Sequence, residues 1–284
     1  MAAVGLLVHH LQPDATRLAH DACSWLLERG HEVRLPEAEA SVAGLDAHGC
    51  PVSAFTKGLD LAVSLGGDGT MLRTVDLVAD DEVPVLGVNL GQLGYLTEVE
   101  PGHLRDALGR FLDGDYEIER RMRMAVEVEA ARVEPGARPA LNEAVLSKTP
   151  TGQIARLEVT VDGKRFTTYT ADGVIVATPT GSTAYAWSAG GPLVAPSHEA
   201  MLLVPVAAHM LFDRSLVLPP TSCIRVAVLD DRAVDLSVDG RSLGSLVEGD
   251  AIVCTAAKSP ARFVTFGGPS FLDILKAKFG LAER

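Results

Sequence analysis

The order of apolar segments limits this chain to a fold with two differently built parts. Over the first 115 residues, short apolar runs that fit β-strands alternate with segments whose apolar residues have helical spacing. Strands that alternate with helices are typical of a parallel sheet with right-handed crossovers. From residue 116 the pattern changes to short strands with Gly, Pro and Asp between them. The sequence therefore predicts an α/β domain with a mainly parallel sheet, followed by a mostly-β domain.

The periodicity also places individual elements. In the first part, strands are expected at Val4–Val8, Val33–Leu35, Leu59–Leu65 and Pro84–Val88. In the second part, Leu157–Val161 and Arg165–Thr170 flank Asp162-Gly163, a dipeptide that favours a two-residue hairpin turn. The last segment, Phe271–Phe279, is predicted to be an amphipathic helix that packs back on the first domain. The expected domains are 1–115 and 116–267, with this helix in 268–284.

Charge and apolar run length exclude several classes of partner. Twenty-five Lys and Arg against 37 Asp and Glu give the 284-residue chain a formal net charge of −12. Such a surface is poorly suited to a phosphodiester backbone, so no nucleic acid partner is expected. The N-terminal residues lack the basic region of a signal peptide, and the apolar stretch Met201–Phe212 is too short to cross a bilayer. We therefore expect a cytoplasmic protein without a membrane partner.

Cysteine and histidine spacing gives no sequence support for a structural metal centre. The four cysteines form no Cys-x-x-Cys pair, and the eight histidines include no His-Glu-x-x-His. The cysteines are expected to be reduced and mostly buried.

The strongest motif of the first part is Gly66-Gly67-Asp68-Gly69-Thr70, between an apolar strand and a helix. Glycines at such a turn let backbone N–H groups face a phosphate, and the helix N-terminus adds its positive dipole. Asp68 is expected at the carboxyl end of the strand, where open α/β sheets bind ligands. The alternative is a tight turn in which Asp68 caps the helix. The pentapeptide alone leaves both possibilities open.

A second Gly-rich segment, Thr178–Pro192, carries five hydroxyl side chains before Trp187. Donors of this density, together with Tyr185, suit a polar ligand that contains a ring. A solvated surface loop would explain the Ser and Thr residues but explains the two aromatic residues poorly. Upstream, Asn142 and Glu143 place an amide and a carboxylate at the start of an apolar strand, a pattern that indicates little by itself.

Taken together, these segments resemble the NAD kinase family from about Leu59 to Phe266. The resemblance rests on the motifs above, on Gly87–Leu96 and on Ala171-Asp172-Gly173. Gly-Gly-Asp-Gly is shared with diacylglycerol-type lipid kinases and, in related form, with phosphofructokinases. The Thr-Pro-Thr-Gly-Ser-Thr-Ala-Tyr segment that begins at Thr178 makes the match specific.

The resemblance implies an α/β domain joined to a β-rich domain, with NAD bound at their junction, in a homodimer or homotetramer. It implies transfer of a phosphoryl group from ATP, or from polyphosphate, to the 2′-hydroxyl of the adenosine ribose of NAD. On the family's pattern, Asp68 is the proton acceptor for that hydroxyl. The positions implied to bind the nucleotide are Gly66, Gly67, Gly69, Arg73, Asn142, Glu143, Asp172, Thr183, Ala184, Tyr185, Ser188, Ala207 and Asp239.

Within this set the resemblance implies distinct roles. Asn142 and Glu143 match the pair that holds adenosine and its ribose, and Tyr185 is the expected stacking partner of adenine. Three positions depart from the family's pattern. Ala208 replaces a Pro before His209, and Met210 replaces a small hydroxyl residue after it. Trp187 is bulkier than the expected aliphatic residue. For His209 itself, a place in the core is an alternative to a place in the site.

The expected chemistry is mainly positioning and charge neutralisation, because phosphoryl transfer passes through a loose, in-line transition state. No Lys follows the glycines as it would in a P-loop, and the chain is acidic. We therefore expect Mg²⁺ or another divalent metal to neutralise the phosphates. A carboxylate is a weak base, so Asp68 is expected to orient the hydroxyl and to accept its proton late.

Two other functions are weighed against the kinase. A lipid kinase would use the same Gly66–Thr70 turn, but should show an apolar face or basic patch for the membrane, and the sequence presents neither. A non-catalytic NAD(P)-binding sensor would keep the Thr178–Pro192 segment, but gives no reason for a carboxylate at position 68. The enzyme is therefore the leading hypothesis.

Overall fold

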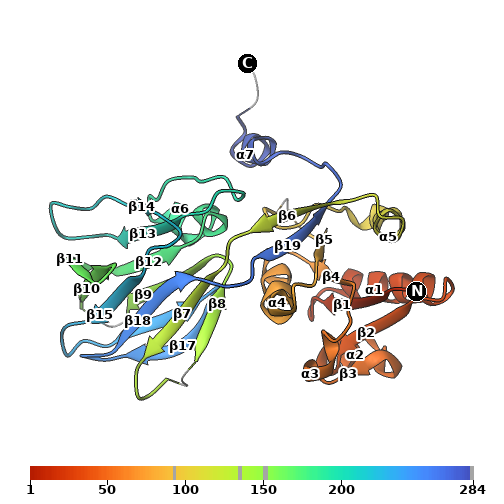
Figure 1. Cartoon of the computed structure of the whole chain (residues 1–284), viewed down its shortest axis with the longest axis horizontal. Coiled ribbons are helices and arrows are strands. Elements are labelled where there is room, and N and C mark those ends of the chain that lie inside the picture. The colour runs from red at the N-terminus through yellow and green to blue at the C-terminus, as the bar shows by residue number, and fades with distance from the viewer. Residues whose placement is uncertain (92–93, 134–135, 150–152, 282–284) are drawn as a thin grey trace. The chain divides into compact units, whose positions relative to one another are not determined.

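The structure, a computed structural model, describes residues 1–91, 94–133, 136–149 and 153–281. The chain divides into a first unit, Met1–Arg120 with Ala261–Arg284, and a second unit, Arg121–Pro260. These bounds differ from the predicted domains, because the strands β6 (Glu117–Arg121) and β19 (Ala261–Thr265) belong to the sheet of the first unit (Figure 1). Both segments lie within 116–267, the range predicted for the β-rich domain.

The first unit is built on a seven-stranded sheet with the order β3-β2-β1-β4-β5-β19-β6. Neighbouring strands from β3 to β19 run parallel. Every residue of the three central strands is buried, as expected for parallel strands covered on both faces. The remaining strands of this sheet are β1 (Ala3–Val8), β2 (Glu32–Pro36), β3 (Gly49–Cys50), β4 (Leu61–Gly66) and β5 (Val85–Asn89).

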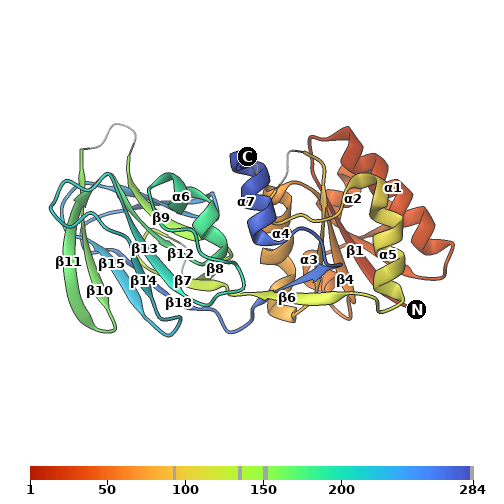
Figure 2. The same cartoon turned by 90° about the horizontal axis from the view of Figure 1, so that it is seen from above.

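Helices cover both faces of this sheet (Figure 2). On one face, Leu18 of α1 and Leu108 of α5 pack with alternate strand residues such as Leu6. On the other face, α4 packs against β4 and buries Met71 and Val75. The helices of the first unit are α1 (Pro13–Leu27), α2 (Glu37–Ala43), α3 (Val52–Phe55), α4 (Asp68–Val78), α5 (Leu104–Leu112) and α7 (Phe271–Phe279), with the 3₁₀ helices η1 (Asp46–His48), η2 (Ala79–Asp81) and η3 (Pro101–His103).

The strand order reverses between β1 and β4. From β1 the chain moves outward to β2 and β3, and it returns to place β4 on the other side of β1. The two strands end side by side, because Val8 pairs with Leu65 and the His9 amide donates to the Leu65 carbonyl over 3.0 Å. Loops that leave adjacent strands in opposite directions form the crevice in which open α/β sheets bind ligands.

The second unit is a β-sandwich of two six-stranded antiparallel sheets. Their orders are β11-β10-β15-β18-β7-β8 and β14-β13-β12-β9-β16-β17. Alternate residues of both sheets, among them Leu157, Val176 and Ile252, form one buried core between them. The strands are β7 (Met124–Glu129), β8 (Ala137–Ala140), β9 (Glu143–Lys148), β10 (Ala155–Val161), β11 (Lys164–Ala171), β12 (Gly173–Ala177), β13 (Met201–Val206), β14 (Leu216–Leu218), β15 (Ile224–Val228), β16 (Val234–Val238), β17 (Arg241–Leu246) and β18 (Ala251–Ala256).

The predicted hairpin turn is confirmed. Asp162 and Gly163 join β10 to β11, and both have positive φ, at 50° and 74°. A two-residue turn with both central residues in the left-handed region matches the twist of the flanking strands, which explains the Asp-Gly sequence.

The Gly-rich segment of the second unit lies on the outer face of the second sheet. It contains η4 (Thr180–Thr183) and α6 (Tyr185–Ser188). Ala186 of α6 is buried against Val145, Ile175 and Val204, in a cluster separate from the sandwich core. Figure 2 shows α6 beside this sheet. The outer face of β9, β12 and β13 thereby carries the segment.

The C-terminal helix α7 begins at a capping box, which Ser270 and Asp273 form. Within the first unit, the Lys278 ammonium of α7 lies 4.4 Å from the centre of the Tyr95 ring.

All four cysteines are free thiols; Cys23 and Cys254 are buried and the other two are half-buried.

Candidate active site

One set of candidate residues lies in the first unit, at the crevice between β1 and β4. A pocket of about 360 Å³ opens there, with walls from the loop after β1 and from the N-terminus of α4. Gly67 and Gly69 of the predicted phosphate-facing turn line it, which places their backbone beside the pocket. Gly66 is the last residue of β4. The pocket is lined by His9, His10, Leu11, Gln12, Gly67, Gly69, Thr70 and Arg73.

Asp68 does not cap its helix. The cap position of α4 is Gly67, and no side chain accepts a hydrogen bond there. The Asp68 carboxylate instead accepts the backbone N–H of Tyr95 over 3.0 Å and that of Leu96 over 3.1 Å, one on each oxygen. A Cβ added to Gly94 would overlap Asp68 Oδ1, so the loop backbone rests directly on the carboxylate. The helix-cap alternative is therefore wrong, and the carboxylate is held by the neighbouring loop.

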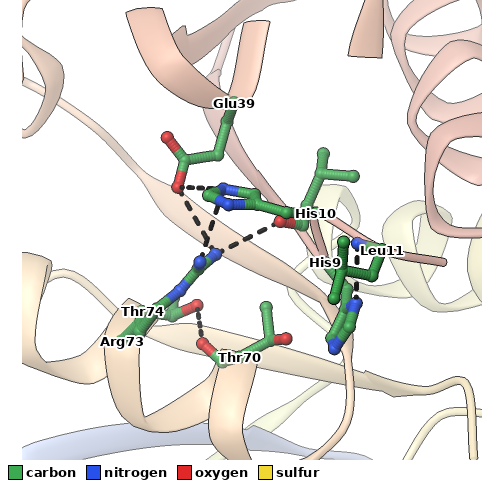
Figure 3. A network of polar contacts seen from close by, with 8 residues as sticks. His9, His10, Leu11, Glu39, Thr70, Arg73 and Thr74 are labelled. Carbon is green, nitrogen blue, oxygen red and sulfur yellow. Dashed lines mark hydrogen bonds and ion pairs between the residues drawn. The ribbon is translucent and has the colours of Figure 1, made fainter. Parts of the chain in front are cut away.

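Arg73 lines the pocket with a cationic side chain. Figure 3 shows its polar contacts. Arg73 lies in α4, a little over one turn after Asp68, so its side chain reaches back toward the end of β1. Its guanidinium donates to the Val8 carbonyl over 3.2 Å and to Glu39 Oε1 over 3.4 Å. Its other terminal nitrogen lies 3.4 Å from His10 Nε2.

A second set of candidate residues lies in the second unit and is organised by Asp239. Its carboxylate accepts the backbone N–H groups of Leu141, Asn142 and Glu143 over 2.7 to 3.0 Å. Asp239 itself has a positive φ of 46°, which directs its side chain back toward β9. Asp239, which the sequence predicts to bind the nucleotide, thus holds the backbone of Asn142 and Glu143 by hydrogen bonds.

The start of the Gly-rich segment packs on the same backbone. The Thr178 N–H donates to the Asn142 carbonyl over 2.9 Å, and a Cβ on Gly181 would overlap that carbonyl oxygen. Three buried polar atoms in this region have no hydrogen-bond partner among the described residues: Asn142 Oδ1, Glu143 Oε2 and Thr180 Oγ1. Buried polar atoms are almost always paired, so this cluster is suited to a polar ligand.

Glu143 has an unusual environment for a carboxyl group. Its side chain is buried with 7% exposure. Burial, together with the negative charge of Asp239, raises the pKa of the Glu143 carboxyl to about 7, although a hydrogen bond from the Tyr185 backbone lowers it in part. Near neutral pH this group can therefore either accept a hydrogen bond or donate one to a ligand hydroxyl.

The rest of the Gly-rich segment presents aromatic rings to solvent. Tyr185 is 44% exposed and Trp187 is 41% exposed, although their neighbour Ala186 is buried. Ser188 is also exposed, and Thr183 and Ala184 are half-buried. Two exposed rings beside buried unpaired acceptors fit a ligand with a flat aromatic base.

The remaining predicted residues lie at the carboxyl end of β13 and the start of β12. Asp172 is half-buried and pairs with Lys148 over 2.8 Å. Ala207 is exposed and has a positive φ of 46°. His209 is exposed as well, so its alternative place in the core is wrong. The chain leaves β13 before it reaches His209, whose N–H donates to Thr170.

Several residues near the site were absent from the sequence prediction. His9, His10, Gln12 and Glu39 lie with the candidate residues of the first unit, and Thr180 and Lys148 lie with those of the second unit. Thr180 belonged to a predicted segment and could have been singled out by its place between Pro and Gly. The others stand outside every motif, and only the strand order brings them to the site.

The chemistry of these two residue sets defines a class: the chain is a nucleotide-binding phosphotransferase. Residues 4–116 match the family model described as the ATP-NAD kinase N-terminal domain, and residues 141–266 match that of the ATP-NAD kinase C-terminal domain. The chain therefore belongs to the NAD kinase family, whose members phosphorylate NAD.

Individual relatives agree over the full length. The chain is 36% identical over 285 residues to an NAD kinase of Syntrophotalea carbinolica, which covers 100% of both chains. It is 39% identical over 280 residues to an NAD kinase of Heliobacterium modesticaldum, with 98% of each covered. Among solved structures, it is similar to a yeast NADH kinase complexed with NADH, with a TM-score of 0.92, 26% identity and coverage of 100% and 89%. An Archaeoglobus fulgidus NAD kinase in complex with ATP has a TM-score of 0.74 at 27% identity, with coverage of 99% and 98%.

The raised pKa of Glu143 predicts a pH-dependent stability. Between pH about 4.5 and about 7, the unfolded chain loses this proton while the folded protein keeps it, so the free energy of unfolding falls as pH rises. We expect Glu143→Gln to remove this part of the fall, on the order of 3 kcal/mol between pH 5 and pH 8. Urea unfolding at both pH values measures it. Glu248→Gln, at an exposed position, is the matched control and should behave as wild type. Equal pH dependence in Glu143→Gln and wild type would contradict the assignment.

Proposed function

We propose that this chain transfers a phosphoryl group to the 2′-hydroxyl on the adenosine side of NAD, which yields NADP, with ATP or polyphosphate as donor. The observation that carries the proposal is the joint presence of a held carboxylate at a phosphate-facing glycine turn and a cluster of unpaired buried acceptors beside exposed rings. The family assignment favours this reaction over a lipid kinase.

Asp68 is the proposed proton acceptor. The 2′-hydroxyl oxygen forms the new bond to phosphorus, the bond from phosphorus to the leaving phosphate chain breaks, and the hydroxyl proton passes to Asp68. The hydrogen bonds from Tyr95 and Leu96 hold the carboxylate in one orientation. A fixed acceptor lowers the entropic cost of reaching the in-line geometry.

The donor set at this turn fits a divalent metal. Carboxylate oxygens are hard ligands of the kind that Mg²⁺ prefers, and Mg²⁺ usually binds through one or two carboxylates plus substrate phosphates. Each Asp68 oxygen accepts one backbone N–H in the structure, which leaves lone pairs on both. Asp68 is the residue proposed to hold the metal, which would neutralise phosphate charge when bound.

The second unit is proposed to hold the nucleoside. Asn142 Oδ1 and Glu143 Oε2 are the acceptors proposed for adenosine and its ribose, and Thr180 Oγ1 adds a hydroxyl. Tyr185 is the proposed stacking partner of adenine, and the loop residues Thr183, Ala184 and Ser188 line the base. Asp172 and Ala207 are proposed further contacts of the dinucleotide.

The setting of the reaction is also a proposal. We place the enzyme in the cytoplasm as a homodimer or homotetramer. Among the residues that the structure describes, no helix has both the length and the apolar character to cross a membrane.

One incubation tests the function. Purified protein with NAD, ATP and Mg²⁺ should form NADP, detected by an NADP-specific dehydrogenase, and a parallel sample with polyphosphate compares the two donors. A non-catalytic sensor would bind NAD without forming NADP, and a lipid kinase would phosphorylate diacylglycerol vesicles instead.

Replacement of the proposed proton acceptor should remove turnover selectively. We expect Asp68→Asn to lower kcat by roughly 10²- to 10⁴-fold and to leave the affinity for NAD within a few-fold. Because Asn offers one acceptor oxygen to two backbone N–H groups, thermal unfolding must be measured alongside. Loss of turnover and NAD affinity together would instead indicate a structural role.

A second variant moves the carboxylate without removing it. In Gly94→Ala the new methyl group overlaps Asp68 Oδ1, so the carboxylate must turn or the loop must shift. We expect kcat to fall about tenfold or more, with a smaller change in the KM for NAD. Gly91→Ala is the matched control in the same loop, because a Cβ there meets nothing within 4 Å. Equal kcat values for the two variants would argue against a precise placement of Asp68.

A further inference from the structure

Arg73 is held by three groups from two other elements of the first unit (Figure 3). The Val8 carbonyl at the end of β1 and the Glu39 carboxylate of α2 both accept from one terminal nitrogen, over 3.2 and 3.4 Å. His10 Nε2 lies 3.4 Å from the other terminal nitrogen and 3.5 Å from Glu39 Oε1. The four groups therefore form one connected network.

The network borders the pocket at the end of β1 and β4. His10 and Arg73 both line it, and so does the backbone of Gly67 and Gly69. The start of α4 adds its positive dipole. A guanidinium, imidazoles and glycine amides around one space are suited to a phosphate group.

The buried position of the Glu39 carboxylate would be energetically unfavourable without its contact with Arg73. Its side chain is 11% exposed, whereas that of Arg73 is 32% exposed. Burial of a carboxylate is costly without charge-assisted hydrogen bonds, and Glu39 makes its contacts with Arg73 and His10. Both terminal nitrogens of the guanidinium are anchored by these partners, and the partly exposed Arg73 side chain lines the pocket.

We propose that Glu39 is a positioning residue, which holds the Arg73 guanidinium in the geometry that receives a phosphate group in the pocket. The inference rests on the proposed function, because the phosphate belongs to a substrate of that reaction, either the chain of the donor or the pyrophosphate of the dinucleotide.

Glu39 could act through its charge or by positioning Arg73, and the two roles predict opposite effects of its removal on anion binding. If Glu39 acts only through its charge, its removal makes the pocket more positive and strengthens anion binding. If Glu39 positions Arg73, its removal frees a long side chain that must then be ordered on binding, which weakens it. A Gln side chain keeps an acceptor for Arg73 but carries no charge.

Binding of inorganic tripolyphosphate, measured by isothermal titration calorimetry without NAD, separates these effects. We expect Glu39→Ala to weaken binding about three- to tenfold and Glu39→Gln to retain at least the wild-type affinity. Glu37→Ala is the matched control, since it removes the same charge from an exposed position of the same helix, and should stay within twofold of wild type. Equal or tighter binding by Glu39→Ala would overturn the proposal.

A double variant tests whether Glu39 acts through Arg73. Arg73→Gln should weaken tripolyphosphate binding more than Glu39→Ala does, and the addition of Glu39→Ala to Arg73→Gln should have no further effect. Additive losses would overturn the positioning role. Thermal unfolding of each variant shows whether a loss of tripolyphosphate binding comes from misfolding. If Glu39→Ala is misfolded, the folded Glu39→Gln variant is compared with wild type in its place.

Steady-state kinetics identify the source of the phosphate. A higher KM for ATP in Glu39→Ala, with kcat retained, assigns the pocket to the donor chain, and a higher KM for NAD assigns it to the dinucleotide. Unchanged values for both would overturn the proposal. If wild-type protein binds tripolyphosphate but forms no NADP, the proposed function fails while the positioning role of Glu39 stands.

Discussion

Aspartate carboxylates that accept backbone N–H groups organise the candidate residues of each unit. Asp68 accepts from Tyr95 and Leu96 in the first unit, and Asp239 accepts from three consecutive N–H groups that begin at Leu141 in the second. Hydrogen bonds to an ionised acceptor are stronger than neutral ones, and the loops gain a defined shape from them. The groups proposed to contact substrate are placed by these loops, so their positions depend on the two carboxylates.

An acidic chain can bind a phosphate-rich substrate when the positive groups are local. The net charge of −12 gives no general attraction to anions. The pocket instead combines the start of α4, glycine amides and the guanidinium of Arg73. Glu39 adds a further negative charge close to this cation. A count of charges gives no reason for a carboxylate at this position. The proposed role of Glu39 in anchoring the guanidinium gives one.

Local patterns predicted local structure well. The Asp162-Gly163 turn is as expected, because its positive φ values depend on the two residues themselves. The assignment of β19 to a domain was wrong for the opposite reason. Phe263 pairs with Val85, far earlier in the chain, and no periodicity within β19 indicates which sheet receives it. Domain bounds placed where the sequence pattern changes therefore missed that β19 returns to the sheet of the first unit.

The sequence by itself determined the two kinds of architecture, the motifs and the resemblance that led to the family, because apolar periodicity and short motifs are properties of neighbouring residues. Only the tertiary structure decided where the Asp68 carboxylate points, since its partners Tyr95 and Leu96 lie in a loop after another strand. The same holds for Glu39 beside Arg73, because α2 and α4 lie far apart in the sequence and meet at the end of β1. Contacts between distant segments depend on strand order, and strand order follows from the packing of the whole unit rather than from any one segment.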